Sequence, residues 1–242
     1  MRSIIVTGAS SGIGRVTAEQ FLAEGWIVGL LARSADTLNQ MAADHAKAIP
    51  LVADVTDADA VEAAFGTFQE KAGRLDVLFN NAGIFAPGGT IDEIALEDWY
   101  QSINVNLNGM FLCARQAFRI MRHQSRQGGR IINNGSIAAH VPRPNSVHYS
   151  ATKHAITGLT RSLSLDGRDF GIACGQIDIG NARTQMVQGL VENAVAAGQQ
   201  PDPTMAVEDA ARSVVHMANL PPEANIQFMT VMATTMPYIG RG

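Results

Sequence analysis

The chain has 242 residues, of which 46% are hydrophobic and 17% are charged, and its net charge is −4. This composition predicts one globular domain over residues 1–242 with a substantial core, and it excludes a disordered chain. The acidic balance provides no basic surface for nucleic acid or for an anionic membrane, so neither is an expected partner. A β-rich run from residue 3 leaves no room for a signal peptide, and the cytoplasm is the expected location.

The N-terminal segment predicts a strand, a glycine turn and a helix in direct succession. The strand covers residues 3–7, and Gly8, Gly12 and Gly14 follow it in a G-x-x-x-G-x-G spacing. Gly8 permits a tight turn, Gly12 lets the backbone approach a pyrophosphate, and Gly14 allows close packing of helix on strand. Because the amino end of a helix attracts anions, this segment predicts a phosphate-binding loop.

The same loop contains an alternative motif from another reaction class. Residues 8–12 also match the G-x-S-x-G elbow of serine hydrolases, with Ser10 as the nucleophile and one of the six histidines as its base. Such an elbow needs an earlier strand and loop to supply a second oxyanion donor, and only seven residues precede Gly8. Position therefore disfavours the hydrolase.

The second strand, at 27–32, ends in a sequence that bears on cofactor choice. Acidic side chains about twenty residues past a glycine motif bind the ribose of NAD, but Ala32 and Arg33 occupy this place. The Arg33 guanidinium matches a phosphate, which favours NADP over NAD. The competing hypothesis makes Asp36 the ribose ligand, although Asp36 better fits the first turn of a helix capped by Ser34.

The remaining strands are predicted at 48–52, 76–79, 129–134, 171–178 and 226–232, and helical patterns separate them. Strands that alternate with helices indicate parallel pairing through right-handed crossovers. We therefore expect an α/β fold, a Rossmann-like doubly wound sheet of seven strands in the order 3-2-1-4-5-6-7 with helices on both faces. The stretch 183–206 is the longest without a strand.

Near the middle of the chain, Tyr149 and Lys153 are four positions apart on a predicted helix, and Ser136 precedes the tyrosine by thirteen residues. Positions i and i+4 share one helix face, so the Lys153 ammonium can lie beside the Tyr149 ring. A neighbouring cation favours the phenolate and so prepares a phenol for proton transfer near neutral pH.

Together these motifs resemble the short-chain dehydrogenase/reductase (SDR) family over nearly the whole chain. Residues 7–14 look like its cofactor motif, Asp54-Val55 like its adenine contact, and residues 80–83 like its central-strand motif. The resemblance implies a catalytic tetrad of Asn106, Ser136, Tyr149 and Lys153. The cofactor-binding residues that it and the glycine loop imply are Gly8, Ser10, Ser11, Gly12, Ile13, Gly14, Arg33, Asp54, Val55, Asn81, Ala82, Gly83, Tyr149, Lys153, Ile179, Gly180 and Thr184.

The resemblance also implies the roles of the tetrad. Tyr149 gives its proton to a carbonyl oxygen while the nicotinamide hydride reaches the carbon, and Ser136 polarises that oxygen. Lys153 binds the nicotinamide ribose, and Asn106 holds a water that relays protons to it. The expected enzyme is an NADP(H)-dependent oxidoreductase of ketones, aldehydes or secondary alcohols, with NAD as the alternative cofactor. A non-catalytic dinucleotide sensor is the other alternative, and the sequence does not specify the substrate.

The chain departs from the family after the sixth strand, where Ile179 stands in place of the usual proline before Gly180. The path of this loop is therefore left open. By resemblance, 183–206 is a mobile substrate lid, and helices near 104–124 and 147–168 form a homotetramer or homodimer contact through Phe111, Phe118, Ile156 and Leu163.

Several other residues receive structural interpretations. His140 and His148 are expected as surface imidazoles and Arg143 as a solvated loop residue, with ligand contacts as the alternative for each. Cys113 and Cys174 are expected in the core, since two distant cysteines form neither a disulfide framework nor a metal site. No histidine has the spacing of a metal ligand motif, so no metal is expected.

Overall fold

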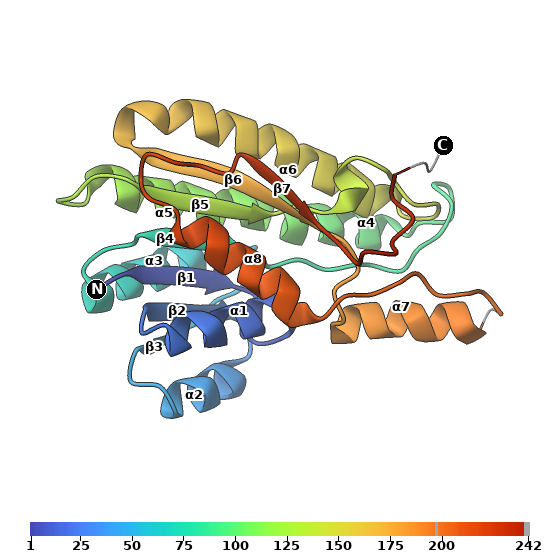
Figure 1. The fold of residues 1–242 in the computed structure, drawn as a ribbon, viewed down its shortest axis with the longest axis horizontal. Helices are drawn as coiled ribbons and strands as arrows, with labels where there is room; N and C mark the ends of the chain where they lie inside the picture. Colours follow the sequence, from blue (N-terminus) through green and yellow to red (C-terminus); the bar gives the residue numbers. More distant parts are fainter. Residues whose placement is uncertain (197, 240–242) are drawn as a thin grey trace.

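The computed structural model describes residues 1–196 and 198–239, which build one parallel sheet of seven strands in the order β3-β2-β1-β4-β5-β6-β7 (Figure 1). This order and the parallel pairing confirm the prediction. Each strand begins and ends within two residues of its expected position. The strands are β1 (Ser3–Thr7), β2 (Ile27–Ala32), β3 (Ala48–Val52), β4 (Val77–Asn80), β5 (Gly129–Asn134), β6 (Ile172–Ile179) and β7 (Phe228–Val231).

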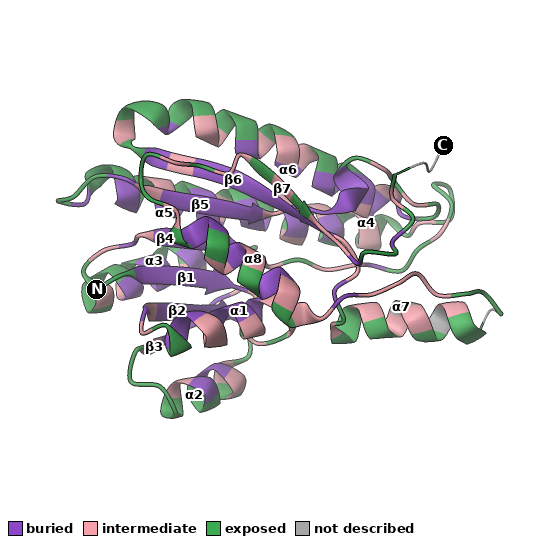
Figure 2. Ribbon diagram, viewed as in Figure 1, coloured by how far each residue is buried: buried purple, intermediate pink, exposed green. Residues whose placement is uncertain are grey.

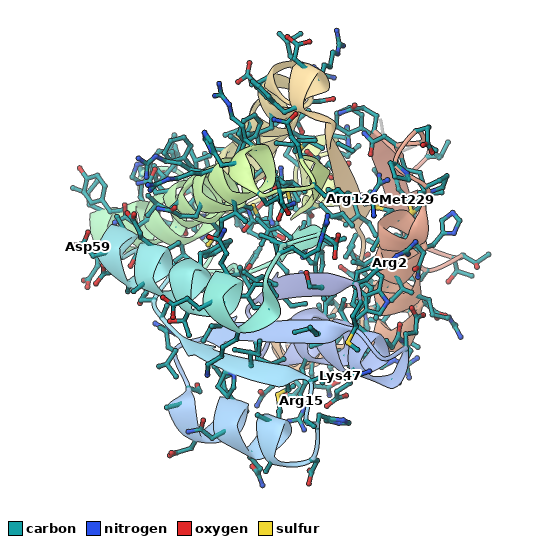
Figure 3. The ribbon with its side chains drawn as sticks, turned by 90° about the vertical axis from the view of Figure 1, so that its left-hand side faces the viewer. Arg2, Arg15, Lys47, Asp59, Arg126 and Met229 are labelled. Carbon is teal, nitrogen blue, oxygen red and sulfur yellow. The ribbon has the colours of Figure 1, made fainter. Side chains whose placement is uncertain are left out.

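Helices cover both faces of the sheet. Helices α1 (Gly12–Ala23), α2 (Ala35–Ala43) and α8 (Val207–Asn219) pack on one face, and α3 (Ala58–Ala72), α5 (Met110–His123) and α6 (Val147–Asp166) pack on the other. Figure 3 shows α1, with Arg15 labelled, and α3, with Asp59 labelled, on opposite sides of the strands.

The two helix layers enclose two apolar cores because strand side chains alternate between faces. In β1, Ile4 and Val6 belong to the core under α1 and α8, whereas Ile5 belongs to the core under α3 and α5. All five residues of β1 are buried, as expected of a central parallel strand (Figure 2). The sheet is therefore a rigid platform, and the loops at the carboxyl ends of its strands are held in fixed positions.

One long helical run crosses the second face in three parts. Helix α4 (Leu96–Ile103) continues into a π-helical turn, η1 (Asn104–Gly109), and then into α5. The sequence predicted an ordinary helix over 104–124, and the wider turn is a difference from it. In this turn the Asn106 side chain is buried. Its Oδ1 accepts from the Ile84 amide at 2.8 Å, and its Nδ2 donates to the Ile84 carbonyl at 2.9 Å.

The strandless stretch 183–206 contains helix α7 (Gln185–Ala196), which projects beyond the edge where the strands end (Figure 1). The base of this segment is closed by an isolated bridge between Ala182 and Met205. The Arg183 amide donates to the Met205 carbonyl at 2.9 Å, and the Met205 amide donates to Asn181 at 2.9 Å. No helix among the described residues is long and apolar enough to cross a membrane.

Candidate active site

The glycine loop opens a cleft of about 600 Å³ at the carboxyl edge of the sheet. Gly8 and Gly12 have φ values of +69° and +53°, a region that side-chain-bearing residues rarely adopt. A Cβ on Gly14 would lie 2.3 Å from the Gly8 carbonyl oxygen, so this glycine allows α1 to approach β1. Gly14 is also the one expected cofactor-binding residue that does not line the cleft.

The amino end of α1 faces this cleft, and no acidic residue of its first turn neutralises its partial positive charge. Ser11 is the N-cap residue, but its side chain makes no capping hydrogen bond, and the first turn carries no acidic residue. The first N–H groups of a helix have no acceptor within the helix, so they attract anions. Glycine loop, helix end and cleft volume together fit a dinucleotide pyrophosphate.

A hydrogen-bonded belt joins β1, β4 and β5 beneath the loop. The Thr7 hydroxyl accepts from the amides of Asn81 and Ala82 at 2.8 and 2.9 Å. The Asn81 side chain donates to the Thr7 carbonyl and accepts from Asn134, at 2.9 and 2.8 Å. This belt fixes the residues after β4 against the floor of the cleft.

Arg33 and Asp54 stand at the outer end of the cleft. The two side chains form an ion pair at 3.8 Å, and they are 73% and 40% exposed. A hydrogen bond from the Thr56 amide holds the pKa of Asp54 below its usual value. Partial burial raises this pKa, but the Thr56 hydroxyl and the Arg33 charge lower it further. Arg33 is therefore an accessible cation with only a weak tie to its neighbour.

Asp36, the competing ribose ligand, is exposed in the first turn of α2 and does not line the cleft. Ser34 is the N-cap residue of α2 as expected, but its side chain makes no capping hydrogen bond. Ser34 lines the cleft instead.

Tyr149 and Lys153 both line the cleft from α6. The Lys153 Nζ lies 5.5 Å from the centroid of the Tyr149 ring, as their spacing on one helix face predicts. Lys153 is buried and donates to the Asn134 carbonyl at 2.8 Å. The Phe85 ring, 4.9 Å from the Tyr149 ring, contacts the tyrosine from another side. The pair is thus fixed in position beside the floor of the cleft.

Ser136 is the second residue after β5, the strand that leads to this floor. It is the N-cap residue of a short 3₁₀ turn, η2 (Ile137–Ala139), and its Oγ accepts from the Ala138 amide at 3.1 Å. Its own amide donates to Asp178 on β6 at 2.9 Å. Ser136 and Asn106 are not part of the lining of the cleft.

The structure places all the other expected cofactor-binding residues around one cleft, including Ile179, Gly180 and Thr184. Sequence reasoning missed further residues that complete the lining. They are Leu31, Ala32, Ala53, Ile84, Gln101, Val105, Asn134, Gly135, Ala182, Gln185, Met186 and Val187, besides Ser34. Most of them flank a residue that was expected, so their signal was proximity in the chain rather than residue type.

The loop path left open at Ile179 is now defined. Ile179 is the last residue of β6, is 7% exposed and pairs with Val231 of β7. The Gly180 amide donates to the Val231 carbonyl at 2.8 Å, so the chain stays on the sheet before it turns. Ile179 thus continues the regular pairing of β6 with β7 at the position where a proline was expected.

Two of the structural interpretations, those of His148 and Arg143, were wrong. His148 is fully buried, because it packs beside Phe85 and bonds the Ala86 carbonyl at 3.1 Å. The expectation for His140 holds, since its side chain is 39% exposed, although its Nε2 also bonds Asp178 at 2.8 Å. Arg143 is not a solvated residue, because it bonds Asn181 at 2.6 Å and pairs with Asp202 at 3.7 Å.

The two cysteines lie in the core as expected. Burial raises the pKa of the Cys113 and Cys174 thiols to about 12. Among the described residues, no group of three His, Cys, Asp or Glu side chains is placed to hold a metal ion.

A doubly wound sheet with a glycine-turn cleft and a Tyr-Lys pair beside it defines a class, the nicotinamide-dependent oxidoreductases with a Rossmann-like fold. Comparison with known proteins narrows this class. Residues 2–216 match the short chain dehydrogenase family. The chain therefore belongs to the short-chain dehydrogenase/reductase family, whose members oxidise CH–OH groups or reduce C=O groups with a nicotinamide dinucleotide.

Individual relatives support this assignment. A 3beta-hydroxysteroid dehydrogenase from Mediterraneibacter gnavus is 39% identical over 72% of the chain, which spans 63% of that relative's length. A cis-4-hydroxycyclohexanecarboxylate dehydrogenase from Sinomonas cyclohexanicum is 35% identical over 90% of the chain and 89% of the relative. The solved structure of ElxO with NADP bound has a TM-score of 0.84, at 26% identity over 95% and 96% of the two chains.

Proposed function

We propose that the protein interconverts a secondary alcohol and a ketone with NADP(H), with Tyr149 as the acid and base. The observation that carries this proposal is the Tyr149–Lys153 pair, which lines the cofactor cleft with 5.5 Å between Nζ and the ring centroid. The two relatives are named for hydroxylated compounds, which favours secondary alcohols as the substrate class.

Each residue of the tetrad has a distinct role in this proposal. A bound nicotinamide supplies or accepts the hydride. Tyr149 donates a proton to the substrate oxygen during reduction and removes it during oxidation. Ser136 hydrogen-bonds the same oxygen through its hydroxyl, and Lys153 favours the phenolate and binds the nicotinamide ribose. Asn106 anchors the π turn next to this group, from where it would hold the relay water.

The alternatives have less support. Ser10 lines the cofactor cleft, and no histidine among the described residues hydrogen-bonds it. A serine hydrolase needs such a base at the nucleophile. A non-catalytic sensor could use Lys153 to bind the ribose, but it would not need the Tyr149 phenol beside it.

Tyr149→Phe is the experiment that tests the function. The ring packing against Phe85 remains, but the proton donor is lost, so turnover should fall about a hundredfold or more while cofactor binding survives. Lys153→Ala should weaken both turnover and cofactor binding. Near wild-type turnover in the phenylalanine variant, measured by reduced-nicotinamide absorbance on an identified carbonyl substrate, would contradict the assignment.

NADP preference rests on Arg33. The guanidinium is exposed at the end of the cleft, it is tied only to Asp54 at 3.8 Å, and no acidic side chain of β2 takes the ribose position. A charge-assisted contact to the 2′-phosphate contributes about 1.5–3 kcal/mol. Asp54 pairs with the same guanidinium and reduces this gain, because the 2′-phosphate must share the guanidinium with Asp54 or displace Asp54 from it.

Titration of both cofactors into three proteins tests the preference. Arg33→Ala should weaken NADP binding by about tenfold to a hundredfold and leave NAD binding nearly unchanged. The matched control Arg15→Ala removes an exposed α1 arginine that pairs with Glu19 and does not line the cleft. This control should change neither affinity. Tighter binding of NAD than of NADP by the wild-type protein would refute the NADP assignment.

A further inference from the structure

Asp178 is a fully buried carboxylate behind the catalytic serine. Its side chain is 1% exposed, yet it stands on β6 among apolar neighbours in the strand. Burying a carboxylate is costly unless hydrogen bonds and an opposite charge compensate, and an apolar residue of similar size is often at least as stabilising. A buried carboxylate at this position is therefore a candidate for a role in function.

Three hydrogen-bond donors converge on this carboxylate. Oδ1 accepts from the Ser136 amide at 2.9 Å and from the Gln176 side chain at 2.7 Å. Oδ2 contacts the Nε2 of His140 at 2.8 Å. Of these donors only the imidazole can carry a positive charge. Asp178 therefore ties the backbone of the catalytic serine and the ring of His140 to the same buried group.

Gly135 shows that this arrangement is built into the loop. A Cβ at this position would lie 2.0 Å from Asp178 Oδ1 and 2.6 Å from the Gln176 amide nitrogen. The carboxylate and the amide thus fill the space that a side chain on residue 135 would need. The three residues fit together as a unit, and Gly135 also lines the cofactor cleft.

The contact with Asp178 fixes which nitrogen of His140 faces the outside. A carboxylate accepts hydrogen bonds, so Nε2 must carry its proton, and Nδ1 bears the lone pair when the ring is neutral. The side chain is 39% exposed, and Nδ1 makes no hydrogen bond to a described residue. His140 follows Ser136 by one 3₁₀ turn and does not line the cofactor cleft. Because one carboxylate holds both His140 and the Ser136 amide, the free nitrogen of His140 is exposed close to Ser136 and outside the cofactor cleft.

We propose that His140 is a second recognition group of the substrate site, which binds a hydroxyl that the substrate carries besides the reacting oxygen. Asp178 is the positioning residue that holds both His140 and Ser136. A hydroxyl fits best because it can donate to a neutral Nδ1 and accept from a protonated one. The substrate class is then a diol or a hydroxyketone. This inference rests on the proposed alcohol and ketone chemistry.

A measurement without turnover tests the inference first. Long-range ¹⁵N–¹H spectra of the histidine-labelled protein with NADP⁺ should show His140 with its proton on Nε2, at a pH where the spectrum shows a neutral ring. Adding 1,2-, 1,3- or 1,4-cyclohexanediol should move the Nδ1 resonance, whereas cyclohexanol should not. A proton on Nδ1, or equal shifts with all four alcohols, would overturn the inference. The resonances that disappear in the His140→Gln variant identify those of His140.

Asp178→Asn provides a sharper version of the same test. The asparagine oxygen can still accept from the Ser136 amide, but its NH₂ group must donate to Nε2 of His140. The neutral ring should then carry its proton on Nδ1, which reverses the tautomer. An unchanged tautomer would show that Asp178 does not set the ring, and this outcome would also overturn the inference.

Kinetics then separates recognition from packing. His140→Phe keeps a ring without its nitrogens, and the ratio of kcat/KM for the preferred diol to that for cyclohexanol should fall about three- to tenfold. His123→Phe, an exposed histidine on α5, is the matched control and should leave this ratio unchanged. Equal losses on both alcohols in His140→Phe would overturn the inference. Wild-type protein that oxidises neither alcohol, yet gives the diol-specific shift, would contradict the proposed function alone.

Discussion

Lys153 has two partners that constrain it in different ways. Its ammonium lies beside the Tyr149 ring, and it donates to the Asn134 carbonyl at 2.8 Å. Asn134 also bonds Asn81, which in turn is tied to Thr7 of β1. The position of this ammonium is thus coupled through hydrogen bonds to the strand that carries the glycine loop. Substitutions of Asn134 should therefore affect both cofactor binding and Tyr149, the proposed proton donor.

The two buried cysteines allow a simple test of the core. Because burial raises the pKa of Cys113 and Cys174 to about 12, both are neutral thiols at pH 8, and the thiolate is the reactive form. Neither should react with the disulfide reagent DTNB in the native protein, and two should react in denaturant. Cys113→Ala should reduce the denatured count to one. Rapid labelling of native protein would contradict the buried placement.

Residue patterns predicted the site where its members are close in the sequence. The Tyr149–Lys153 pair follows from helix geometry, and the glycine loop follows from its spacing and its flanking elements. The environments of His140, His148 and Arg143 did not follow, because their partners are far away in the chain. Asp178, for example, is 38 residues beyond His140. Long-range partners of polar side chains have no periodic signal in a single sequence.

At the scale of elements, α1 and β1 form the contact on which the cofactor site depends. Gly14 lies within this contact, where a methyl group would meet the Gly8 oxygen at 2.3 Å and the Asn81 amide nitrogen at 2.7 Å. Neither atom belongs to a free side-chain end, since Asn81 is held by Thr7 and Asn134.

Gly14→Ala should therefore destabilise the protein and weaken cofactor binding. Overpacking of this kind costs about 1–3 kcal/mol, measurable as a lower midpoint in urea unfolding. Gly66→Ala is the matched control, because Gly66 is a glycine inside α3 with nothing within 4 Å of its Cβ position. Alanine there should stabilise by about 0.5–1 kcal/mol. A Gly14→Ala protein as stable as wild type would show that α1 can move away from β1.

Strands and helices were predicted more completely than the turns between them. Apolar runs predicted all seven strands, and their alternation with helical patterns predicted the parallel order. The π turn at Asn104–Gly109 and helix α7 were not predicted, since each depends on contacts with other segments. Asn106 holds the π turn through Ile84, and the ends of the α7 segment are joined by Ala182 and Met205.

For the whole molecule, the exposed apolar side chains of α4 and α5 raise the question of assembly. Leu96, Tyr100 and Phe111 are 70%, 59% and 50% exposed. Leu96 and Tyr100 are one turn apart on α4. Ile156 cannot contribute as the sequence suggested, because it is fully buried within the chain.

We expect a homodimer or homotetramer that uses this surface. Light scattering at micromolar concentration should give a multiple of the chain mass of 25.7 kDa. Phe111→Glu should shift the mass toward the monomer, whereas Val195→Glu, at a residue of α7 that is 60% exposed, should not. A monomeric wild-type protein would refute the assembly.

The cleft takes its lining from residues as distant as Gly8 and Val187. A chain emerging from the ribosome therefore cannot offer a complete dinucleotide site until more than three quarters of its length has been made and its central strands have paired. The cofactor then binds only finished molecules and stabilises them by mass action, by about 2.7 kcal/mol when its free concentration is a hundred times its Kd. In a cell, the supply of nicotinamide dinucleotide would thus influence how much of this protein survives proteolysis.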